Sequence, residues 1–431
     1  MSGSEALDHH GSHRDLLWSG DHVQSQRIDA VFVPTVRTPA YLDAASRLAH
    51  EIDCTLVTLH SRQWTTAAKA AQRLPKTVDL VAIDVPDPDL LRLPRFQTSL
   101  LAAHKVFPWD PRRLPTDLSA KRNLALVLSR LLGWSRVLFL DDDITGLKPA
   151  EVLDAGGLLD THNAVGLQVV GFPDHSVVCH AYRDAGGSQQ SFIGGGALAV
   201  HVQRSTSFFP EIYNDDWFFL LDDDKGLQPV AMTGQVTQKR YDPFRNPERA
   251  RAEEFGDVLA EGIYWLLDQE LSIADADRAH WAVFLAKRRQ FIQRVLAMVT
   301  NSSLESAEKA RRIAALKGSL GRLALITPAL CEDYLRAWQA DRQQWQRFVQ
   351  DLPAGLDRVA ALRLLSADGA PPVRWHLSGR SHRTADRRPA LKAPVVREPA
   401  PNELAAPQFV TAPMPAIRPD RMAEPVGSLA D

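Results

Sequence analysis

The sequence predicts an α/β fold: a mostly parallel sheet covered by helices on both faces, followed by an α-helical C-terminal region. Up to about residue 245, short apolar runs bounded by Pro, Asp and Gly alternate with helical stretches. This alternation is typical of parallel sheets, whose strands are buried on both faces. Beyond residue 245 the strand pattern stops, and four segments rich in Ala, Leu, Arg and Gln show helical spacing.

Six apolar runs, each four to seven residues long, are the predicted strands. They are residues 28–33, 55–59, 80–83, 137–140, 164–170 and 197–200. The helices predicted after the sheet are residues 255–267, 274–299, 306–320 and 330–352. Each of these helices carries a polar face, so each is expected to pack against the protein on its other side.

The composition divides the chain into four parts. Residues 1–27 are rich in His, Ser, Gly and Asp and lack periodicity, so we expect a disordered leader. Residues 28–245 form the α/β domain and residues 246–365 the helical domain. Residues 366–431 are expected to be a disordered tail rich in Pro, Ala and Arg, because 11 of the 28 prolines follow residue 370.

Charge and cysteine content exclude several classes of protein. The 50 Lys and Arg residues nearly balance the 52 Asp and Glu residues, so no overall basic field attracts nucleic acid or anionic lipid. Three widely spaced cysteines exclude a disulfide framework and a cysteine-based zinc site. No signal peptide and no run of about 18 apolar residues is found. We therefore expect a cytoplasmic protein that has no transmembrane segment and does not bind nucleic acid.

The strongest chemical signal is the acidic end of the strand at 137–140, where Asp141, Asp142 and Asp143 follow in sequence. Strand alternation is expected to send Asp141 and Asp143 to one side and Asp142 to the other. Two such charges about 6.5 Å apart repel by roughly 2.5 kcal/mol at a dielectric of about 20. A divalent cation would offset this repulsion, and carboxylates suit Mg²⁺ or Mn²⁺. The alternative is an acidic loop that caps a helix starting near Pro149.

Ligands of open α/β sheets bind at the carboxyl ends of the strands, where two basic segments also stand. After the first strand, Pro34, Thr35 and Arg37 could present backbone donors and a guanidinium to a nucleotide. An ordinary strand-to-helix connection explains the same residues. Lys121 and Arg122 lie near a predicted helix start, where the dipole disfavours cations, so they could serve an anion or form a solvated basic turn.

A glycine segment and an acidic pair complete the set. Gly194, Gly195 and Gly196 precede the strand at 197–200, and their lack of side chains allows close backbone approach to a ligand. About twenty residues later, Asn214 could cap a helix whose first turn holds Asp215 and Asp216. One of these acids could act as a general base, or the segment could be only a well-capped helix.

Taken in this order, the four segments resemble the GT-A nucleotide-sugar-dependent glycosyltransferases, most closely those of the family 2 type. The resemblance covers residues 28 to 241 and rests on residues 33–37, 120–123, 139–143 and 194–196 together with 214–217. It implies a Rossmann-like GT-A catalytic domain at 28–245. It also implies transfer of a sugar from a nucleoside-diphosphate sugar to a hydroxyl acceptor, assisted by Mn²⁺ or Mg²⁺.

The resemblance also implies roles for single residues. Asp141 and Asp143 would hold the cation, and Asp215 or Asp216 would be the catalytic base. The remaining candidates would contact the nucleotide sugar or line its site: Pro34, Thr35, Arg37, Arg122, Asp142, Gly194, Gly195, Gly196 and Trp217.

Some features depart from the family pattern. The strand at 55–59 is followed by His60, where the family has an acid that reads the nucleobase, so Asp84 is a possible substitute and the base stays open. The acidic pair is Asp-Asp rather than Glu-Asp, which leaves inversion or retention open. The helical domain would shape an acceptor pocket or form a contact between subunits of a homo-oligomer.

Two other functions fit the same residues. The segment from Asp141 to Thr145 matches the Asp-x-Asp-x-Thr motif of haloacid-dehalogenase-type phosphatases, with Asp141 as nucleophile and Asp143 as acid and base. Against this, that motif normally ends the first strand of its domain, and three predicted strands precede it here. A noncatalytic GT-A scaffold is the third possibility.

Overall fold

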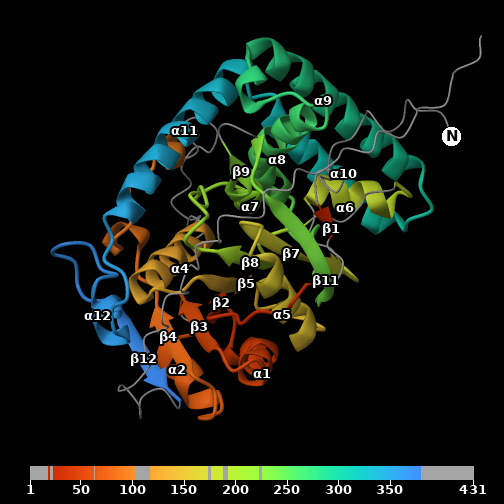
Figure 1. Ribbon diagram of the computed structural model, residues 1–431. Coiled ribbons are helices and arrows are strands. Elements are labelled where there is room, and N and C mark those ends of the chain that lie inside the picture. The colour runs from red at the N-terminus through yellow and green to blue at the C-terminus, as the bar shows by residue number, and fades with distance from the viewer. Residues whose placement is uncertain are drawn as a thin grey trace, which may run out of the picture. The chain divides into compact units, whose positions relative to one another are not determined.

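The computed structural model describes residues 18–19, 23–62, 64–101, 117–172, 176–187, 193–222 and 226–379. These residues all belong to one compact unit, Met1–Ala385; the second unit, Asp386–Asp431, lies outside the described residues. The unit contains a large sheet with helices on both faces (Figure 1). The predicted α/β fold is therefore confirmed.

Strands occur from Trp18 to Ser378. Their bounds are β1 (Trp18–Ser19), β2 (Ala30–Thr35), β3 (Thr55–His60), β4 (Leu80–Asp84), β5 (Arg136–Leu140), β6 (Ile144–Thr145), β7 (Ala164–Val170), β8 (Ala197–His201), β9 (Leu221–Asp222), β10 (Gly226–Leu227), β11 (Val230–Gln238) and β12 (Arg374–Ser378). All six predicted strands are confirmed, as β2, β3, β4, β5, β7 and β8.

The α-helices lie between the strands and then dominate the chain after β11. Their bounds are α1 (Asp43–Glu51), α2 (Ala67–Arg73), α3 (Gln97–Leu101), α4 (Leu118–Leu132), α5 (Pro149–Leu158), α6 (Val177–Asp184), α7 (Asp215–Phe219), α8 (Glu248–Leu267), α9 (Arg278–Asn301), α10 (Ser306–Leu323), α11 (Pro328–Gln350) and α12 (Arg358–Arg363). The four helices predicted beyond residue 245 correspond to α8, α9, α10 and α11.

The strands of the main sheet follow the order β1-β11-β7-β8-β5-β2-β3-β4-β12, with β6 beside β11. β5, β2, β3 and β4 are parallel to one another, and β11 is parallel to β7. β8 runs antiparallel to both of its neighbours, β5 and β7. The carboxyl ends of β2, β5, β7 and β11 therefore meet the amino end of β8 at one edge of the sheet.

The two faces of the sheet carry separate hydrophobic clusters. In β2, Val31 and Val33 belong to the cluster that also contains residues of α1, α2 and α5. Ala30 and Phe32 point to the opposite cluster, which contains residues of α4, α6, α7 and α8. Because both faces are covered, the strands are apolar throughout, and this is why the sequence identified them.

The helical region shares its core with the sheet. The cluster that contains Phe32 continues into α9, α10 and α11, where Trp281 and Trp338 are fully buried. Residue 245 therefore marks a change of secondary structure within one core, and the predicted domain boundary there does not separate two cores. α11 begins with Thr327, whose side chain accepts the N–H of Leu330, and with Pro328 in its first turn.

Part of the segment predicted to be a disordered tail belongs to the sheet. β12 pairs antiparallel with β4, and Trp375 of β12 lies opposite Ile83. The prediction of disorder is therefore wrong for residues 366–379, because a short polar edge strand shows little apolar alternation. Residues 380–431 lie outside the described residues.

The predicted leader is also shorter than expected. The N–H of Gln26 donates to the carbonyl of Leu153, and a Cβ at Gly156 would lie 2.4 Å from the carbonyl oxygen of Gln26. Residues 23–27 therefore pack against α5, and Trp18–Ser19 pairs with β11. Residues 1–17 and 20–22 lie outside the described residues.

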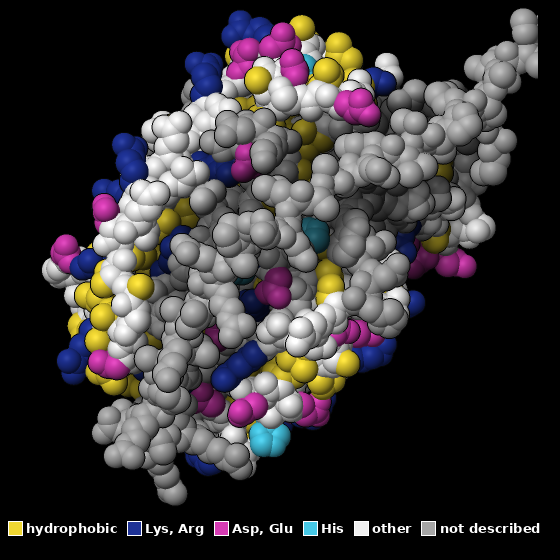
Figure 2. Space-filling model, in the orientation of Figure 1, with side chains coloured by type: hydrophobic (Ala, Val, Ile, Leu, Met, Phe, Trp, Pro, Cys, Tyr) yellow, Lys and Arg dark blue, Asp and Glu magenta, His cyan; other side chains and the backbone are white. Residues whose placement is uncertain are grey.

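β11 is the longest of the described strands that sequence reasoning missed. Its sequence contains Thr and Gln beside its apolar residues, and Gly234 has φ 60° at a register shift between Thr233 and Gln235. A bulge of this kind interrupts the alternation that identifies a strand. On the face drawn in Figure 2, acidic side chains are mixed with basic ones, as the near-neutral composition predicts.

Candidate active site

The acidic segment after β5 and the glycine segment before β8 contact each other at the carboxyl edge of the sheet. The N–H of Asp141 donates to the carbonyl oxygen of Gly196 at 2.9 Å. Thr35, the last residue of β2, donates its hydroxyl to Oδ2 of Asp142 at 2.5 Å. Three segments that the sequence singled out separately are therefore neighbours in space.

Asp141, Asp142 and Asp143 form a turn and do not continue the strand. β5 ends before Asp141, and the N–H of Ile144 donates to the carbonyl of Asp141 at 3.1 Å. Nη1 of Arg37 contacts Oδ1 of Asp142 at 2.6 Å and Oδ2 of Asp143 at 3.0 Å. The prediction that alternation separates Asp142 from Asp143 is therefore wrong, because alternation ends with the strand.

Two basic side chains border this acidic turn. The guanidinium of Arg37 lies 5.1 Å from the ring centre of Tyr41, and Nζ of Lys239 lies 4.6 Å from the same ring. The N–H of Lys239 donates to the carbonyl of Asp143 at 3.0 Å. Burial would lower the pKa of Arg37, but Asp142 and Asp143 outweigh it and raise that pKa. Burial raises the pKa of Asp142, an effect that its hydrogen-bond partners partly offset.

Arg122, on α4, links the acidic turn to the acidic pair of α7. Its Nη1 contacts Oδ1 of Asp215 at 2.7 Å, and its Nη2 lies 3.5 Å from Oδ1 of Asp141. Only 4% of the Arg122 side chain is exposed. Burial would lower the pKa of Arg122, but Asp215, Asp141 and Asp216 raise it above its usual value, so the guanidinium stays charged.

The two acids of the pair have different surroundings. Asp215 is buried, and its carboxylate accepts hydrogen bonds from Arg122 and from the Ser119 hydroxyl. Burial raises the pKa of Asp215 to about 6, although Arg122 opposes this shift. Asp216 is partly exposed, and its two oxygens accept the N–H groups of Gly195 at 2.6 Å and of Trp217 at 2.9 Å. Asp216 therefore faces the glycine segment, whereas Asp215 faces the interior.

The glycine segment lies between the two acidic groups because it has no side chains. A Cβ at Gly195 would come within 2.6 Å of the Arg122 guanidinium. A Cβ at Gly194 would lie 3.0 Å from Oδ2 of Asp216, and a Cβ at Gly196 would lie 3.1 Å from Oδ2 of Asp141. Glycine is therefore required at position 195. The close approach of Asp216 to Gly194, and of Asp141 to Gly196, explains why these two positions are also glycine.

Three predicted residues lie elsewhere than expected. Pro34 is buried inside β2, opposite Leu59, and has no N–H to offer a nucleotide. Trp217 is 2% exposed, and its ring packs edge-on against Tyr264 in the core. Asn214 has φ 65°, and its side chain does not cap α7.

Side-chain contacts of Asn214 lead instead to the helical region. Its Nδ2 donates to Asp257 of α8 at 3.0 Å. The hydroxyl of Tyr264, also on α8, donates to the carbonyl of Trp217 at 3.0 Å. The helical region therefore fixes the position of α7, and with it the acidic pair.

His60 and Asp84, at the positions where a residue that reads the nucleobase was expected, form hydrogen bonds within the protein. His60 is buried, and its ring nitrogens lie 2.7 Å from the Thr65 hydroxyl and 2.8 Å from the Thr58 hydroxyl. Burial lowers the pKa of His60 to about 3, so the ring is neutral. Oδ1 of Asp84 accepts the N–H of Ala67 at the start of α2. Asp84 thus has a structural partner already.

The structure gives Lys121 contacts within the protein and adds Ser119 to the predicted site. The buried ammonium of Lys121 donates to the carbonyl of Thr35 and the hydroxyl of Ser61. It contacts protein atoms, so it is not a solvated basic turn. Ser119 supports Asp215 and lies three residues before Arg122 on one face of α4, a spacing that could have identified it.

The carboxylates of the site are oxygen donors of the kind that a divalent cation takes, but within the described residues they do not form a metal site by themselves. Within the described part of the chain, the four basic side chains Arg37, Lys121, Arg122 and Lys239 lie near five carboxylates, which leaves one net negative charge if all are ionised. The carboxylates are those of Asp141, Asp142, Asp143, Asp215 and Asp216. This surplus of negative charge favours a cation, and Mg²⁺ or Mn²⁺ binds oxygen ligands. The same part of the chain has no group of three or more His, Cys, Asp or Glu placed to hold a metal. Substrate oxygens would therefore have to complete the shell.

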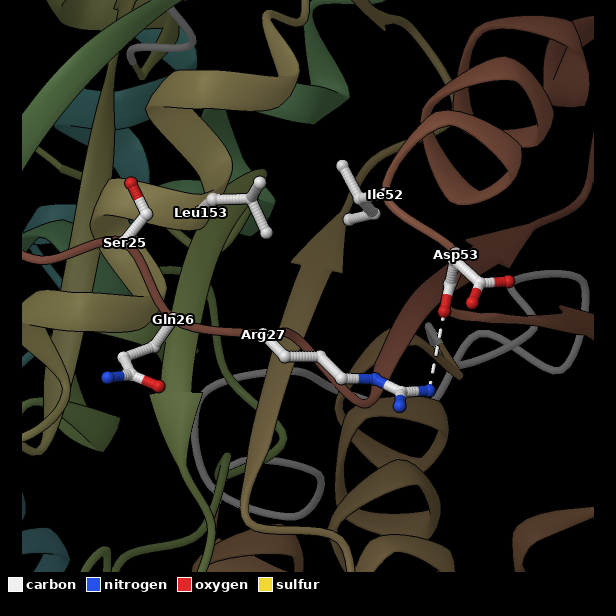
Figure 3. A pocket seen from close by; sticks show the side chains of 6 residues that line it. All are labelled: Ser25, Gln26, Arg27, Ile52, Asp53 and Leu153. Carbon is white, nitrogen blue, oxygen red and sulfur yellow. Dashed lines mark hydrogen bonds between the residues drawn. The ribbon is translucent and has the colours of Figure 1, made fainter.

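A separate pocket of about 330 Å³ lies near the amino ends of β2 and β3 (Figure 3). It is lined by Ser25, Gln26, Arg27, Ile52, Asp53 and Leu153. Arg27 crosses it and donates to the carbonyl of Asp53 at 3.3 Å. None of the predicted site residues lines this pocket.

Within the described residues, no single helix is long and apolar enough to cross a membrane. The helices Ser306–Leu323 and Pro328–Gln350, bent by 80° at the break between them, meet the length and composition limits only as a pair.

No protein-family model matches the chain, and no curated protein matches it. Among solved structures, it is similar to 4-diphosphocytidyl-2C-methyl-D-erythritol synthase from Anaerococcus prevotii. The identity is 11% and the TM-score 0.25, and the match covers 49% of this chain and 90% of the other.

Proposed function

We propose that the chain is a glycosyltransferase that moves a sugar from a nucleoside-diphosphate sugar to a hydroxyl acceptor. The observation that supports it most is the placement of the glycine segment. The N–H of Gly195 donates to Asp216, and the carbonyl of Gly196 accepts the N–H of Asp141. Arg122, which lies against Gly195, contacts Asp141 and Asp215. A donor held at the acidic turn would then lie beside a carboxylate that can take a proton.

Asp216 is the proposed catalytic base. It is the more exposed acid of the pair, and its Oδ2 accepts the N–H of Gly195 in the glycine segment. In the inverting version of the reaction, the acceptor oxygen attacks the anomeric carbon while the bond from that carbon to the diphosphate oxygen breaks. Asp216 takes the proton of the acceptor hydroxyl, and the nucleoside diphosphate leaves with the electron pair.

Asp215 has a positioning role in this proposal. Its carboxylate is bound by Arg122 and Ser119, and it is buried. These contacts of Asp215 fix the first turn of α7. The hydrogen bonds with Asp257 and Tyr264 of α8 fix the position of the helix as a whole.

Thr35, Arg37 and Asp142 form the proposed donor side. The guanidinium of Arg37 can bind phosphate oxygens in a planar, two-pronged geometry. Asp141 and Asp143 would hold Mn²⁺ or Mg²⁺, and a bound cation would neutralise charge that develops on the departing diphosphate. Gly194, Gly195 and Gly196 would form the floor between donor and acceptor.

A screen of nucleotide sugars for Mn²⁺-dependent thermal stabilisation tests the proposal. A ligand that binds only the native state at about 100 times its Kd stabilises it by about 2.7 kcal/mol. The sugar donor found in this way is then assayed for acceptor-dependent release of its nucleoside diphosphate, with Asp216→Asn as the variant that should bind but not transfer.

The same assays separate the two competing functions. A phosphatase of the haloacid dehalogenase type would release phosphate from p-nitrophenyl phosphate and lose that activity in Asp141→Asn. A noncatalytic scaffold would show neither phosphate release nor sugar transfer. Either result would contradict the proposed function.

A further inference from the structure

Arg37 lies between Asp142 and Asp143, and Asp143 is one of the two proposed ligands of the cation. A single nitrogen, Nη1, lies 2.6 Å from Oδ1 of Asp142 and 3.0 Å from Oδ2 of Asp143. The carboxylate side chains are 9% and 11% exposed, whereas Arg37 is 38% exposed. The acidic turn thus carries its own positive charge, supplied by a side chain that is still partly open to solvent.

Neighbouring groups fix the guanidinium in this position. Thr35 binds the other oxygen of Asp142 and also accepts the N–H of Arg37 through its hydroxyl oxygen at 3.1 Å. The Tyr41 ring lies 5.1 Å away. Arg37 therefore stabilises the turn before any substrate is present, because its positive charge offsets the repulsion between Asp142 and Asp143.

A divalent cation bound to Asp143 would be repelled by this guanidinium, which already contacts Oδ2 of that residue. A divalent ion repels a unit positive charge twice as strongly as another unit charge does at the same distance. Cation binding at Asp143 is therefore weakened as long as the guanidinium stays in this position. A diphosphate offers a partner for the displaced group, because a guanidinium binds phosphate oxygens as well as carboxylates.

We propose that Arg37 is a resident counter-ion that couples cation binding to diphosphate binding. Without substrate it holds Asp143 and weakens cation binding; with a diphosphate present it leaves Asp143 and binds phosphate oxygens, so the cation enters. This inference rests on the proposed function. It adds two statements: the protein without substrate binds the cation weakly, and Arg37 is the reason.

The test is a titration of the full chain with Mn²⁺ alone, followed by electron paramagnetic resonance of the free ion. Arg37→Gln is expected to bind Mn²⁺ about 10-fold more tightly than the wild type, within the usual range of coupling between sites. Adding Asp143→Asn to Arg37→Gln should cancel this gain. Arg278→Gln removes an exposed pair with Glu332 in the helical region and should match the wild type.

The titration is repeated with the nucleoside diphosphate that stabilises the protein most. It should raise Mn²⁺ affinity about 10-fold more in the wild type than in Arg37→Gln, because only the wild type has a counter-ion to displace. Circular dichroism of each variant checks that it is folded.

Three results would overturn the inference. Equal Mn²⁺ affinity of wild type and Arg37→Gln would show that Arg37 does not compete. Tight binding by Arg37→Gln without any gain in the wild type on adding the nucleotide would show that Arg37 replaces the cation permanently. No Mn²⁺ binding by any variant would remove the cation position itself. Failure of the proposed function is distinct, since then no nucleoside diphosphate binds the wild type with or without Mn²⁺.

Discussion

The guanidinium of Arg122 lies directly against the backbone of Gly195, where a Cβ would come within 2.6 Å of its carbon and of both terminal nitrogens. Arg122 cannot yield easily, because it is buried and paired with Asp215 at 2.7 Å. The contact therefore fixes the glycine segment relative to both acidic groups.

Gly195→Ala is expected to destabilise the protein by about 1–3 kcal/mol, as overpacking of a filled site does. It should also abolish nucleotide-sugar binding, because the alanine must displace Arg122 or the glycine segment. Gly321→Ala is the control, since nothing lies within 4 Å of a Cβ there, in the helix α10. That variant should gain up to about 1 kcal/mol in helix propensity. Urea unfolding measures both, and equal stability of the two variants would contradict the contact.

The acids of α7 should separate into a catalytic and a structural residue. Asp216→Asn is expected to lower the transfer rate about 10²- to 10⁴-fold, the usual contribution of a general base. Its stability should fall by only about 1 kcal/mol, because the single amide oxygen of asparagine can accept one of the two N–H groups that Asp216 accepts with two oxygens.

Asp215→Asn should instead lose stability, by up to about 3–5 kcal/mol, because the buried Arg122 loses its closer carboxylate and keeps only the one of Asp141 at 3.5 Å. Calorimetry and turnover of both variants check this division. Normal stability of Asp215→Asn, or normal turnover of Asp216→Asn, would reverse the assignment.

A buried ionic cluster predicts how stability depends on pH. Arg288 of α9 contacts Glu254, Asp257 and Glu261 of α8 at 2.7–2.9 Å. Burial raises the pKa of Glu261 to about 8, despite the attraction of Arg288. A carboxyl whose pKa is higher in the folded protein binds more protons there, so its stabilisation is complete below about pH 4.5 and is lost as the pH rises through about 8.

Glu261→Gln should therefore flatten the fall of unfolding free energy between pH 5 and pH 8. The difference in slope should amount to at least about 1 kcal/mol across this interval, since one pKa unit corresponds to about 1.4 kcal/mol. Glu308→Gln, at an exposed position, serves as the control. Parallel curves for wild type and Glu261→Gln would show that Glu261 does not titrate in this window.

The edge strand β12 should contribute to folding. Trp375 is partly buried against the cluster that contains Phe32, whereas the side chain of Arg374 is 84% exposed. Trp375→Ala is expected to lower the free energy of unfolding by about 1–3 kcal/mol, because apolar burial is lost. Arg374→Ala should change it by no more than about 0.5 kcal/mol. Denaturant unfolding distinguishes them, and a harmless Trp375→Ala would argue that β12 is dispensable.

The sequence predicted those parts of the fold that depend on local pattern. β2, β3, β4 and β5 are apolar because both faces of the sheet are covered, and α8 to α11 carry helical spacing. β11 was missed because its bulge at Gly234 and its Thr and Gln residues hide the alternation. β12 was missed because an edge strand need not be apolar.

For the site, the sequence identified the acidic residues and the glycine segment but not their pairing. Arg37 and Asp142 are separated by 105 residues, and Arg122 and Asp215 by 93. Contacts over such separations are set by the order of the strands, which no local pattern encodes. The expected alternation at Asp142 failed because the strand ends one residue before the acidic turn.

In the proposed reaction, the acidic turn binds a nucleoside diphosphate together with a divalent cation. The most direct test of this binding is the heat of binding of nucleoside diphosphates with Mn²⁺ to the wild type and to a double variant, Asp141→Asn with Asp143→Asn. We predict binding by the wild type and none by the double variant, while both unfold at similar temperatures. Equal binding by the two proteins, or binding of no nucleoside diphosphate by the wild type, would contradict it.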